Sequence, residues 1–168
     1  MEYEVIDNFL DEEYFDSLVT LFTDKEKTGN KVMPWFFQSN IAERGVVEGK
    51  LFYMCHVFYE RTRPNSPLYD QLLNTLEKLD IRSLIRIKAN LYPNTEILHE
   101  HPMHQDYEFS NSSALLSLNT CDGYTKLKDG TKIDSVANRM LLFDASEEHC
   151  STTTTNVSAR INININYF

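Results

Sequence analysis

Four of the five histidines lie between positions 99 and 149, and this stretch holds the residues best suited to chemistry. Within it, His104-Gln105-Asp106 has the form His-x-Asp, and residues two apart on a strand point to the same face of a sheet. A third ligand from another strand would complete a two-histidine, one-carboxylate triad, which holds Fe(II) and keeps coordination positions open. His149 is the only histidine after Asp106. We therefore expect His104, Asp106 and His149 to bind one Fe(II) ion.

Other arrangements of the same residue types remain open at this point. A lone His-x-Asp occurs by chance in many surface loops. His99 and His101 also stand two apart, so a site of three histidines from this segment is a second arrangement. Cys150 beside His149 is a weaker zinc candidate, because adjacent strand residues point to opposite faces and no cysteine pair has zinc-like spacing. A nucleophilic pair of Cys121 with His149 has no support from neighbouring residues.

The last ten residues, 159–168, predict a strictly alternating strand. One face carries isoleucines and a tyrosine, and the other carries Arg160, Asn162, Asn164 and Asn166. Either this polar face lies in water, or it lines the interior of a barrel while the isoleucines pack under helices. In the second case Arg160, 11 residues after His149, offers a guanidinium fork for a carboxylate. A metal triad and a buried arginine would together suit a dicarboxylate that chelates the metal.

The elements that position these residues fall into two parts. Residues 1–83 predict helices and loops, whereas from residue 84 onward short apolar or alternating runs predict strands at 84–91, 114–119, 139–143 and 159–168. Asp129-Gly130 predicts a tight hairpin between residues 125–128 and 131–134. Strands at this spacing indicate a sandwich or barrel. The expected fold class is therefore α+β with a mainly β core, covered on one face by the helices.

Two helices are predicted in the first part. Asp11 would cap a helix with an apolar stripe formed by Tyr14, Phe15, Leu18, Val19 and Phe22. Ser66 would cap a second helix that has Pro67 at its first position and a stripe formed by Leu68, Leu72, Leu73, Leu76 and Leu79. We expect the loops around Trp35–Phe37 and Arg61–Asn65 to face the substrate.

Length and composition exclude several classes of protein. The 168 residues suit a single domain, and 42% hydrophobic residues suffice to form a core. A net charge of −9 disfavours non-specific binding to nucleic acid, and no apolar run reaches the roughly 20 residues of a membrane helix. The first residues lack the basic and apolar regions of a signal peptide, and three well-separated cysteines indicate a reducing, cytoplasmic environment. We expect a monomer or weak dimer.

The order of these motifs resembles the 2-oxoglutarate- and Fe(II)-dependent oxygenases, especially the small members related to prolyl 4-hydroxylases. The resemblance covers residues 84–168, and residues 3–13 look like the start of the first helix in that family. The ordered motifs are Asn90-Leu91-Tyr92, His104-x-Asp106, Ser117-Leu118-Asn119, Asp122-Gly123-Tyr124-Thr125, Ala137–Phe143, His149 and Arg160. This resemblance implies a double-stranded β-helix, a jelly-roll barrel backed by N-terminal helices, with residues 84–168 as its core.

The resemblance also implies roles for individual residues. His104, Asp106 and His149 match the iron ligands, and Arg160 matches the basic residue that pairs with the distal carboxylate of 2-oxoglutarate. Tyr92 matches a tyrosine that hydrogen-bonds this cosubstrate. Asn90 and Asn162 resemble asparagines of AlkB-type demethylases, but the second arginine of that pattern is absent because residue 166 is asparagine.

The implied reaction hydroxylates a C–H bond and releases succinate and CO₂. It needs Fe(II), 2-oxoglutarate and O₂, and ascorbate is a further cofactor candidate. We expect a protein or peptide residue or a free amino acid as substrate, in preference to nucleic acid. Two alternatives from other classes are a non-catalytic jelly-roll module that binds a metal or sugar, and an AlkB-type demethylase. The second would gain support if the basic residues gathered into a patch, namely Arg61, Arg63, Arg82, Arg86 and Lys88.

Overall fold

Two antiparallel sheets form the body of the protein in a computed structural model, which describes residues 2–23, 33–39 and 51–168. The larger sheet has the strand order β1-β9-β6-β11-β5-β3-β2, with β4 paired to β3, and the smaller has the order β10-β7-β8. The larger sheet contains β1 (Tyr3–Ile6), β2 (Phe36–Gln38), β3 (Tyr53–Glu60), β4 (Arg63–Pro64), β5 (Leu84–Pro93), β6 (Ser112–Ser117), β9 (Arg139–Asp144) and β11 (Ala159–Tyr167). The smaller sheet contains β7 (Tyr124–Leu127), β8 (Lys132–Asp134) and β10 (His149–Ser151).

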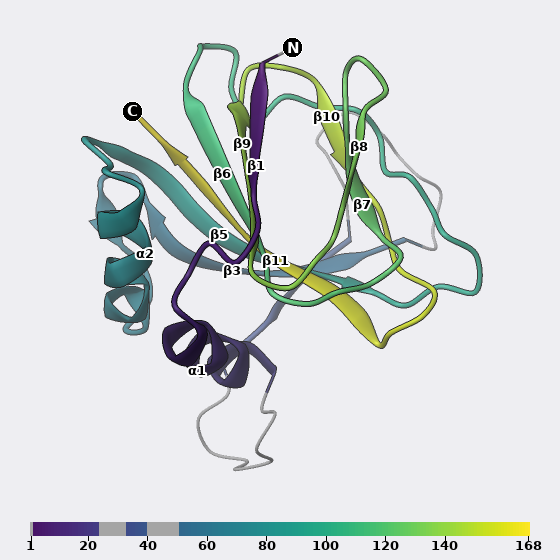
Figure 1. Ribbon diagram of the computed structural model, residues 1–168, viewed down its shortest axis with the longest axis horizontal. Coiled ribbons are helices and arrows are strands. Elements are labelled where there is room, and N and C mark those ends of the chain that lie inside the picture. The colour runs from purple at the N-terminus through teal and green to yellow at the C-terminus, as the bar shows by residue number, and fades with distance from the viewer. Residues whose placement is uncertain (1, 24–32, 40–50) are drawn as a thin grey trace.

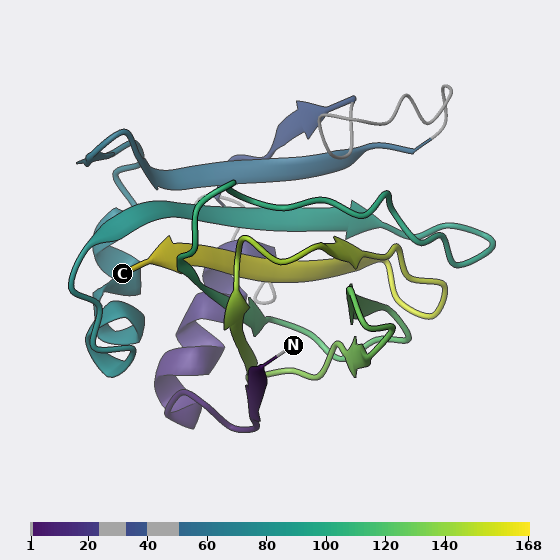
Figure 2. The ribbon, with the colours of Figure 1, turned by 90° about the horizontal axis from the view of Figure 1, so that it is seen from above.

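Helices cover one side of the larger sheet, and the smaller sheet lies on the other side (Figure 1). From above, β3, β5 and β11 run side by side across the molecule (Figure 2). This arrangement confirms the predicted mainly β core with helices against one face. None of the helices in the described residues is long and apolar enough to cross a membrane.

Helix α1 (Glu12–Thr23) forms as its sequence predicts. The Asp11 carboxylate accepts hydrogen bonds from the backbone N–H groups of Glu13 and Tyr14, at 3.1 and 3.4 Å, and so satisfies donors that the first turn leaves free. The apolar stripe of this helix is packed into the main core, where Phe15, Leu18 and Phe22 are buried. The helix therefore covers the isoleucine face of the sheet.

The second predicted helix is shorter and begins later than expected. Ser66 accepts a hydrogen bond from the N–H of Leu68 at 3.1 Å, but a 3₁₀ turn η1 (Tyr69–Leu72) follows it before helix α2 (Leu73–Lys78). Leu72 and Leu76 are buried, whereas Leu73 is 46% exposed. The prediction that Leu73 belongs to the apolar stripe was wrong, because the tighter winding of the 3₁₀ turn changes the direction of the side chains that follow it.

Strand β11 occupies the middle of the larger sheet, between β5 and β6. Ile161, Ile163 and Ile165 pack with the helices in the main core. The alternate residues are also buried, on the opposite face, and these are Arg160, Asn162, Asn164 and Asn166. Their face looks toward the smaller sheet, so the polar face of this strand lines the barrel interior as the second interpretation of the sequence predicted.

Four strands of the larger sheet, β1 to β4, come from the first 83 residues, and the sequence predicted none of them. Strand β1 pairs with β9, which corrects the interpretation of residues 3–13 as the beginning of a helix. Strand β3 pairs with β5 along its length. Residues Phe36–Gln38 form the edge strand β2 beside β3, and residues Arg61–Asn65 form the β3–β4 hairpin. A substrate-facing role for these two segments remains a prediction.

Candidate functional site

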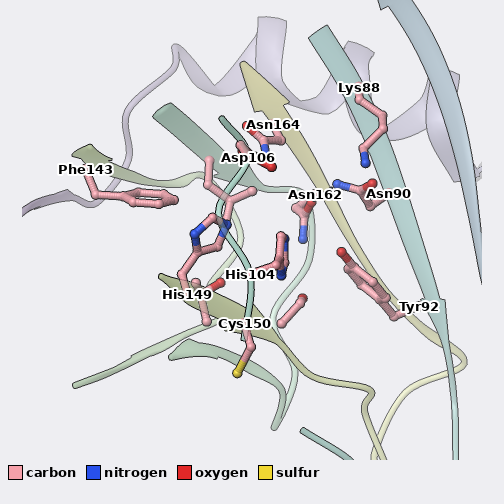
Figure 3. A pocket seen from close by; sticks show the side chains of 13 residues that line it. Lys88, Asn90, Tyr92, His104, Asp106, Phe143, His149, Cys150, Asn162 and Asn164 are labelled. Atoms are coloured by element: carbon pink, nitrogen blue, oxygen red, sulfur yellow. Dashed lines mark hydrogen bonds between the residues drawn. The ribbon is translucent and has the colours of Figure 1, made fainter. Parts of the chain in front are cut away.

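His104, Asp106 and His149 come together at one point in the barrel. His149 lies on β10, and the other two lie in the segment between β5 and β6. Reciprocal backbone hydrogen bonds of 2.9 Å between His104 and His149 fix the two segments against each other. One potential ligand atom from each of the three side chains lies within 4.8 Å of the other two. The geometry therefore matches the predicted triad (Figure 3).

Both imidazoles of this group are oriented for metal binding by backbone carbonyls. The Nδ1 atoms of His104 and His149 lie 3.3 and 3.0 Å from the carbonyl oxygens of Pro102 and Glu147. A carbonyl only accepts hydrogen bonds, so Nδ1 is the protonated nitrogen and Nε2 of the neutral ring keeps its lone pair. Burial, together with His149, lowers the pKa of His104, which favours this neutral form. The donor set of two Nε2 atoms and a carboxylate fits Fe(II).

The Asp106 carboxylate is held in its ionised form by a network of donors. Arg86 donates to Oδ1 at 3.1 Å, and Asn164 and Asn166 donate to Oδ2 at 2.9 and 3.0 Å. Burial by itself raises the pKa of Asp106, but Arg86, His149 and the two asparagines outweigh it and hold the pKa well below its usual range. A ligand carboxylate must be deprotonated, so this network prepares Asp106 for a metal.

The alternative sets of metal ligands that the sequence left open do not form in the described residues. His99 is exposed, and neither it nor His101 belongs to the group around His149. Cys150 lines the same cavity, but its sulfur points away from the two imidazoles (Figure 3). The described residues thus bring together one set of potential metal ligands, namely the set with the carboxylate.

Arg160 is a buried cation that has no carboxylate partner among the described residues. Only 1% of the Arg160 surface is exposed to solvent. Arg160 donates to the hydroxyl groups of Ser151 and Thr125, and its Nε has no hydrogen-bond partner. Burial lowers its pKa, yet a guanidinium stays charged in proteins. Since Ser151 and Thr125 both line the cavity, Arg160 is placed to bind an anion that enters it.

The other predicted cosubstrate residues lie beside Arg160 on the same face of the sheet. Tyr92 is directly opposite Arg160, and Asn90 is directly opposite Asn162, in the β5–β11 register. Asn90 donates to the Asn162 side chain at 3.0 Å. Burial raises the pKa of Tyr92, so its hydroxyl stays protonated and can donate a hydrogen bond. Tyr92, Asn90 and Asn162 line the cavity that also contains the triad.

This cavity, of about 40 Å³, has polar and apolar walls. Polar groups come from β5, β10 and β11, and Leu115 and Phe143 supply apolar surface. The full set of lining residues is Lys88, Asn90, Tyr92, His104, Asp106, Leu115, Thr125, Phe143, His149, Cys150, Ser151, Asn162 and Asn164. A space with these walls holds a small polar ligand in contact with the three potential metal ligands.

Comparisons with known proteins bear on the fold of this chain. No protein-family model matches the sequence, and no curated protein sequence matches it. A prolyl-4-hydroxylase from Pseudomonas putida has a similar structure, with a TM-score of 0.66 and 15% identity over 98% of this chain and 91% of that one. A prolyl hydroxylase from Trichoplax adhaerens, in complex with a peptide fragment of hypoxia inducible factor, has a TM-score of 0.67 and 17% identity over 99% and 83% of the two chains.

A viral collagen prolyl hydroxylase from Paramecium Bursaria Chlorella virus-1, in a 2-oxoglutarate complex, is similar along almost the whole of both chains. Its TM-score is 0.61 and its identity 15%, over 99% of this chain and 95% of that one. This chain has the fold of the prolyl hydroxylases. That fold is the jelly roll of the 2-oxoglutarate and Fe(II) oxygenases, which confirms the predicted fold class.

Several residues of this candidate site were not predicted. Arg86 and Lys88 were expected on a solvated surface or in a basic patch, but Arg86 is paired with Asp106 and Lys88 lines the cavity. Their spacing carried a signal, because residues 86, 88, 90 and 92 share one face of a strand. Thr125 and Ser151 contact Arg160. Thr125 belongs to the motif of residues 122–125 but had no assigned role, and Ser151 had no distinguishing pattern in the sequence.

Proposed function

We propose that this protein is a 2-oxoglutarate- and Fe(II)-dependent dioxygenase that hydroxylates a C–H bond and releases succinate and CO₂. The observation that carries the proposal is the buried Arg160 guanidinium, which lacks a carboxylate partner and donates to Ser151 and Thr125 in the wall of the cavity that His104, Asp106 and His149 also line. A buried, unpaired cation is costly, and a dicarboxylate that also reaches the metal would neutralise it.

Each residue of the site has a role in this proposal. His104, Asp106 and His149 hold the metal, and Arg86, Asn164 and Asn166 keep the Asp106 carboxylate ionised and oriented. Arg160 binds the distal carboxylate of 2-oxoglutarate, together with the hydroxyl groups that already contact it and that of Tyr92. The iron, when bound, supplies the oxidation chemistry, in which one atom of O₂ enters the substrate and the other enters succinate.

The surroundings of the triad support a reaction protected from water. The Phe143 ring lies edge-on to His149, with ring centroids 4.8 Å apart, and the rings of His104 and His149 lie 4.6 Å apart. Phe143 and Leu115 belong to a small apolar cluster between the sheets. These side chains exclude water from one side of the metal position, which limits side reactions of the oxidant.

For the substrate, we propose a protein or peptide residue or a free amino acid. The Trichoplax adhaerens enzyme was solved with a peptide in place, which supports the peptide arm of this proposal. A nucleic-acid substrate is disfavoured because Arg86 is paired within the site and Lys88 lines the cavity, so these two residues do not contribute to a surface patch.

The three cysteines are buried and unpaired, which supports the expected reducing, cytoplasmic environment.

The test is an assay of succinate release with Fe(II), 2-oxoglutarate, ascorbate and O₂, against a panel of peptides and free amino acids. We expect 2-oxoglutarate-dependent succinate release that at least one panel member stimulates, and no release by the His149→Ala variant. Arg139→Ala is the matched control, because Arg139 pairs with Asp7 outside the cavity. A wild-type protein that binds neither Fe(II) nor 2-oxoglutarate would refute the proposal and leave a non-catalytic jelly-roll module.

A further inference from the structure

Lys88 is a cation of the cavity wall for which the proposed chemistry provides no partner. Its side chain projects from β5 into the cavity, with the ammonium group near Asn90 (Figure 3). Neither a hydrogen bond nor an ion pair within the described residues engages this ammonium group. Its one specific contact is with the ring of Tyr53, whose centroid lies 5.5 Å from Nζ.

The charges around the cavity leave Lys88 unmatched. Arg86 is paired with Asp106, at 3.1 Å between Nη2 and Oδ1. Arg160 would be paired with the distal carboxylate of 2-oxoglutarate. Burial lowers the pKa of Lys88, and the nearby Arg86 lowers it further. These two effects outweigh Asp106, Cys55 and Glu60, which act in the opposite direction, so the charged form of Lys88 is disfavoured in this position. An additional anion in the cavity would therefore bind favourably.

The position of Lys88 separates it from the cosubstrate anchor. On β5 it precedes Tyr92 by four residues, which corresponds to about 13 Å along a strand. Tyr92 is opposite Arg160, whereas Lys88 is opposite Asn164, which donates to Asp106. Lys88 thus lies beside the Asp106 network, four residues along the strand from the pair of Tyr92 and Arg160. A second anionic molecule is the better match for it.

We propose that Lys88 binds a carboxylate of the primary substrate, so that the enzyme hydroxylates an acidic compound or an acidic residue. The ammonium group would orient that carboxylate in the cavity and thereby place a neighbouring C–H bond near the iron. This inference rests on the proposed oxygenase function and adds the substrate class to it. The carboxylate could come from a free acidic amino acid or from an Asp or Glu side chain of a peptide, and the experiment separates these sources.

The test measures binding without turnover, in protein loaded with Zn(II) and 2-oxoglutarate. One arm uses free aspartate and glutamate against asparagine and glutamine, and the other uses N-acetylated, C-amidated tripeptides with the same residues at the centre. Affinities are measured by calorimetry for the wild type, Lys88→Met and Lys88→Arg. Lys78→Met is the matched control, because Lys78 also lies over an aromatic ring, that of Phe9, but on helix α2.

We expect the wild type to bind an acidic probe of one arm about 10- to 100-fold more tightly than its amide counterpart, as for a charged hydrogen bond. Lys88→Met should abolish this preference, while Lys88→Arg and Lys78→Met keep most of it. The affinity for 2-oxoglutarate and the melting temperature should change little in Lys88→Met.

Three results would overturn the inference. The first is a wild type that prefers no acidic probe in either arm, and the second is an unchanged preference in Lys88→Met. The third is a loss of 2-oxoglutarate affinity in Lys88→Met as large as that in an Arg160 variant, which would assign Lys88 to the cosubstrate. Failure of the oxygenase proposal itself is seen separately, as absence of 2-oxoglutarate binding to the wild type.

Discussion

Tyr92 and Arg160 face each other across strands β5 and β11, and the guanidinium carbon of Arg160 lies 5.8 Å from the centroid of the Tyr92 ring. His101 also packs on Tyr92, with ring centroids 5.1 Å apart. The guanidinium thus lies against an aromatic ring and two hydroxyl groups, without a carboxylate. Such surroundings fix its direction and leave its charge available to a ligand.

Replacing Arg160 by methionine should weaken 2-oxoglutarate binding by roughly one to three decades. Truncation of one partner in a buried, charged hydrogen-bond pair costs about 2–5 kcal/mol, and each decade of affinity corresponds to about 1.4 kcal/mol. The measurement is anaerobic calorimetry with Mn(II) in place of iron. Metal affinity should stay near that of the wild type, since Arg160 contacts none of the three potential ligands. Unchanged 2-oxoglutarate affinity in a folded variant would place the anchor elsewhere.

Gly123 makes room for the Arg160 side chain. A Cβ atom at this position would lie 2.7 Å from Cδ of Arg160 and 2.6 Å from the carbonyl oxygen of Thr153. Because the carbonyl belongs to the backbone and cannot move easily, Gly123→Ala should destabilise the protein by about 1–3 kcal/mol and displace the guanidinium. We expect a lower melting temperature together with a several-fold loss of 2-oxoglutarate affinity.

Gly130→Ala is the matched control for that substitution. Gly130 has a φ of +90°, so alanine is strained there, but no atom lies within 4 Å of the added Cβ. This variant should lose stability and keep its 2-oxoglutarate affinity. If both glycine variants lowered the affinity equally, the effect would come from general destabilisation, and the specific contact between residue 123 and Arg160 would be refuted.

The sequence predicted strands in which polar and apolar residues alternate better than strands with apolar side chains on both faces. In β11 the alternation of isoleucine with asparagine revealed the strand, the inward direction of Arg160 and the core face together. Strand β3, with the sequence YMCHVFYE, has apolar and aromatic side chains on both faces and no such period. Strand β1 is short and exposed, and it becomes a strand through its pairing with β9.

The candidate site was predicted where the signal was local and was missed where it depended on tertiary structure. His-x-Asp is a local pattern, and His149 followed from being the remaining histidine. The exclusion of His99 and His101 from the metal group needed the fold, because it depends on the backbone pairing of His104 with His149. The contact of Thr125 with Arg160 likewise joins strands β7 and β11, whose contacting residues are 35 positions apart in the sequence.

The metal site can be tested with three histidine variants. His104→Ala and His149→Ala should each reduce Fe(II) affinity at least about 10-fold, because losing a direct ligand costs no less than losing an outer partner. His99→Ala is the control and should bind one Fe(II) like the wild type, since His99 is exposed and outside the group. Anaerobic Fe(II) titration gives the stoichiometry. Loss of the site in His99→Ala, with retention in His149→Ala, would contradict the assigned ligands.

The last prediction concerns the pH dependence of stability and the buried His101. Neither ring nitrogen of this residue has a hydrogen-bond partner, and it is 3% exposed. Burial, together with Arg160, His104 and His99, lowers its pKa from 6.5 to about 4. The unfolded chain therefore takes up this proton first as the pH falls. The folded protein therefore keeps its full stability with respect to His101 above about pH 6.5, and it loses this stability as the pH falls toward 4.

A shift of this size corresponds to about 3 kcal/mol of unfolding free energy. The variant His101→Phe keeps an aromatic ring against Tyr92 but has no group that takes up a proton at this position. Between pH 7 and pH 4, the unfolding free energy of the metal-free variant should therefore fall by about 3 kcal/mol less than that of the metal-free wild type. Urea unfolding at several pH values measures the difference, and the other histidines contribute equally to both proteins. Parallel pH profiles for the two proteins would mean that His101 is protonated at the same pH in the folded and unfolded states, contrary to its buried position.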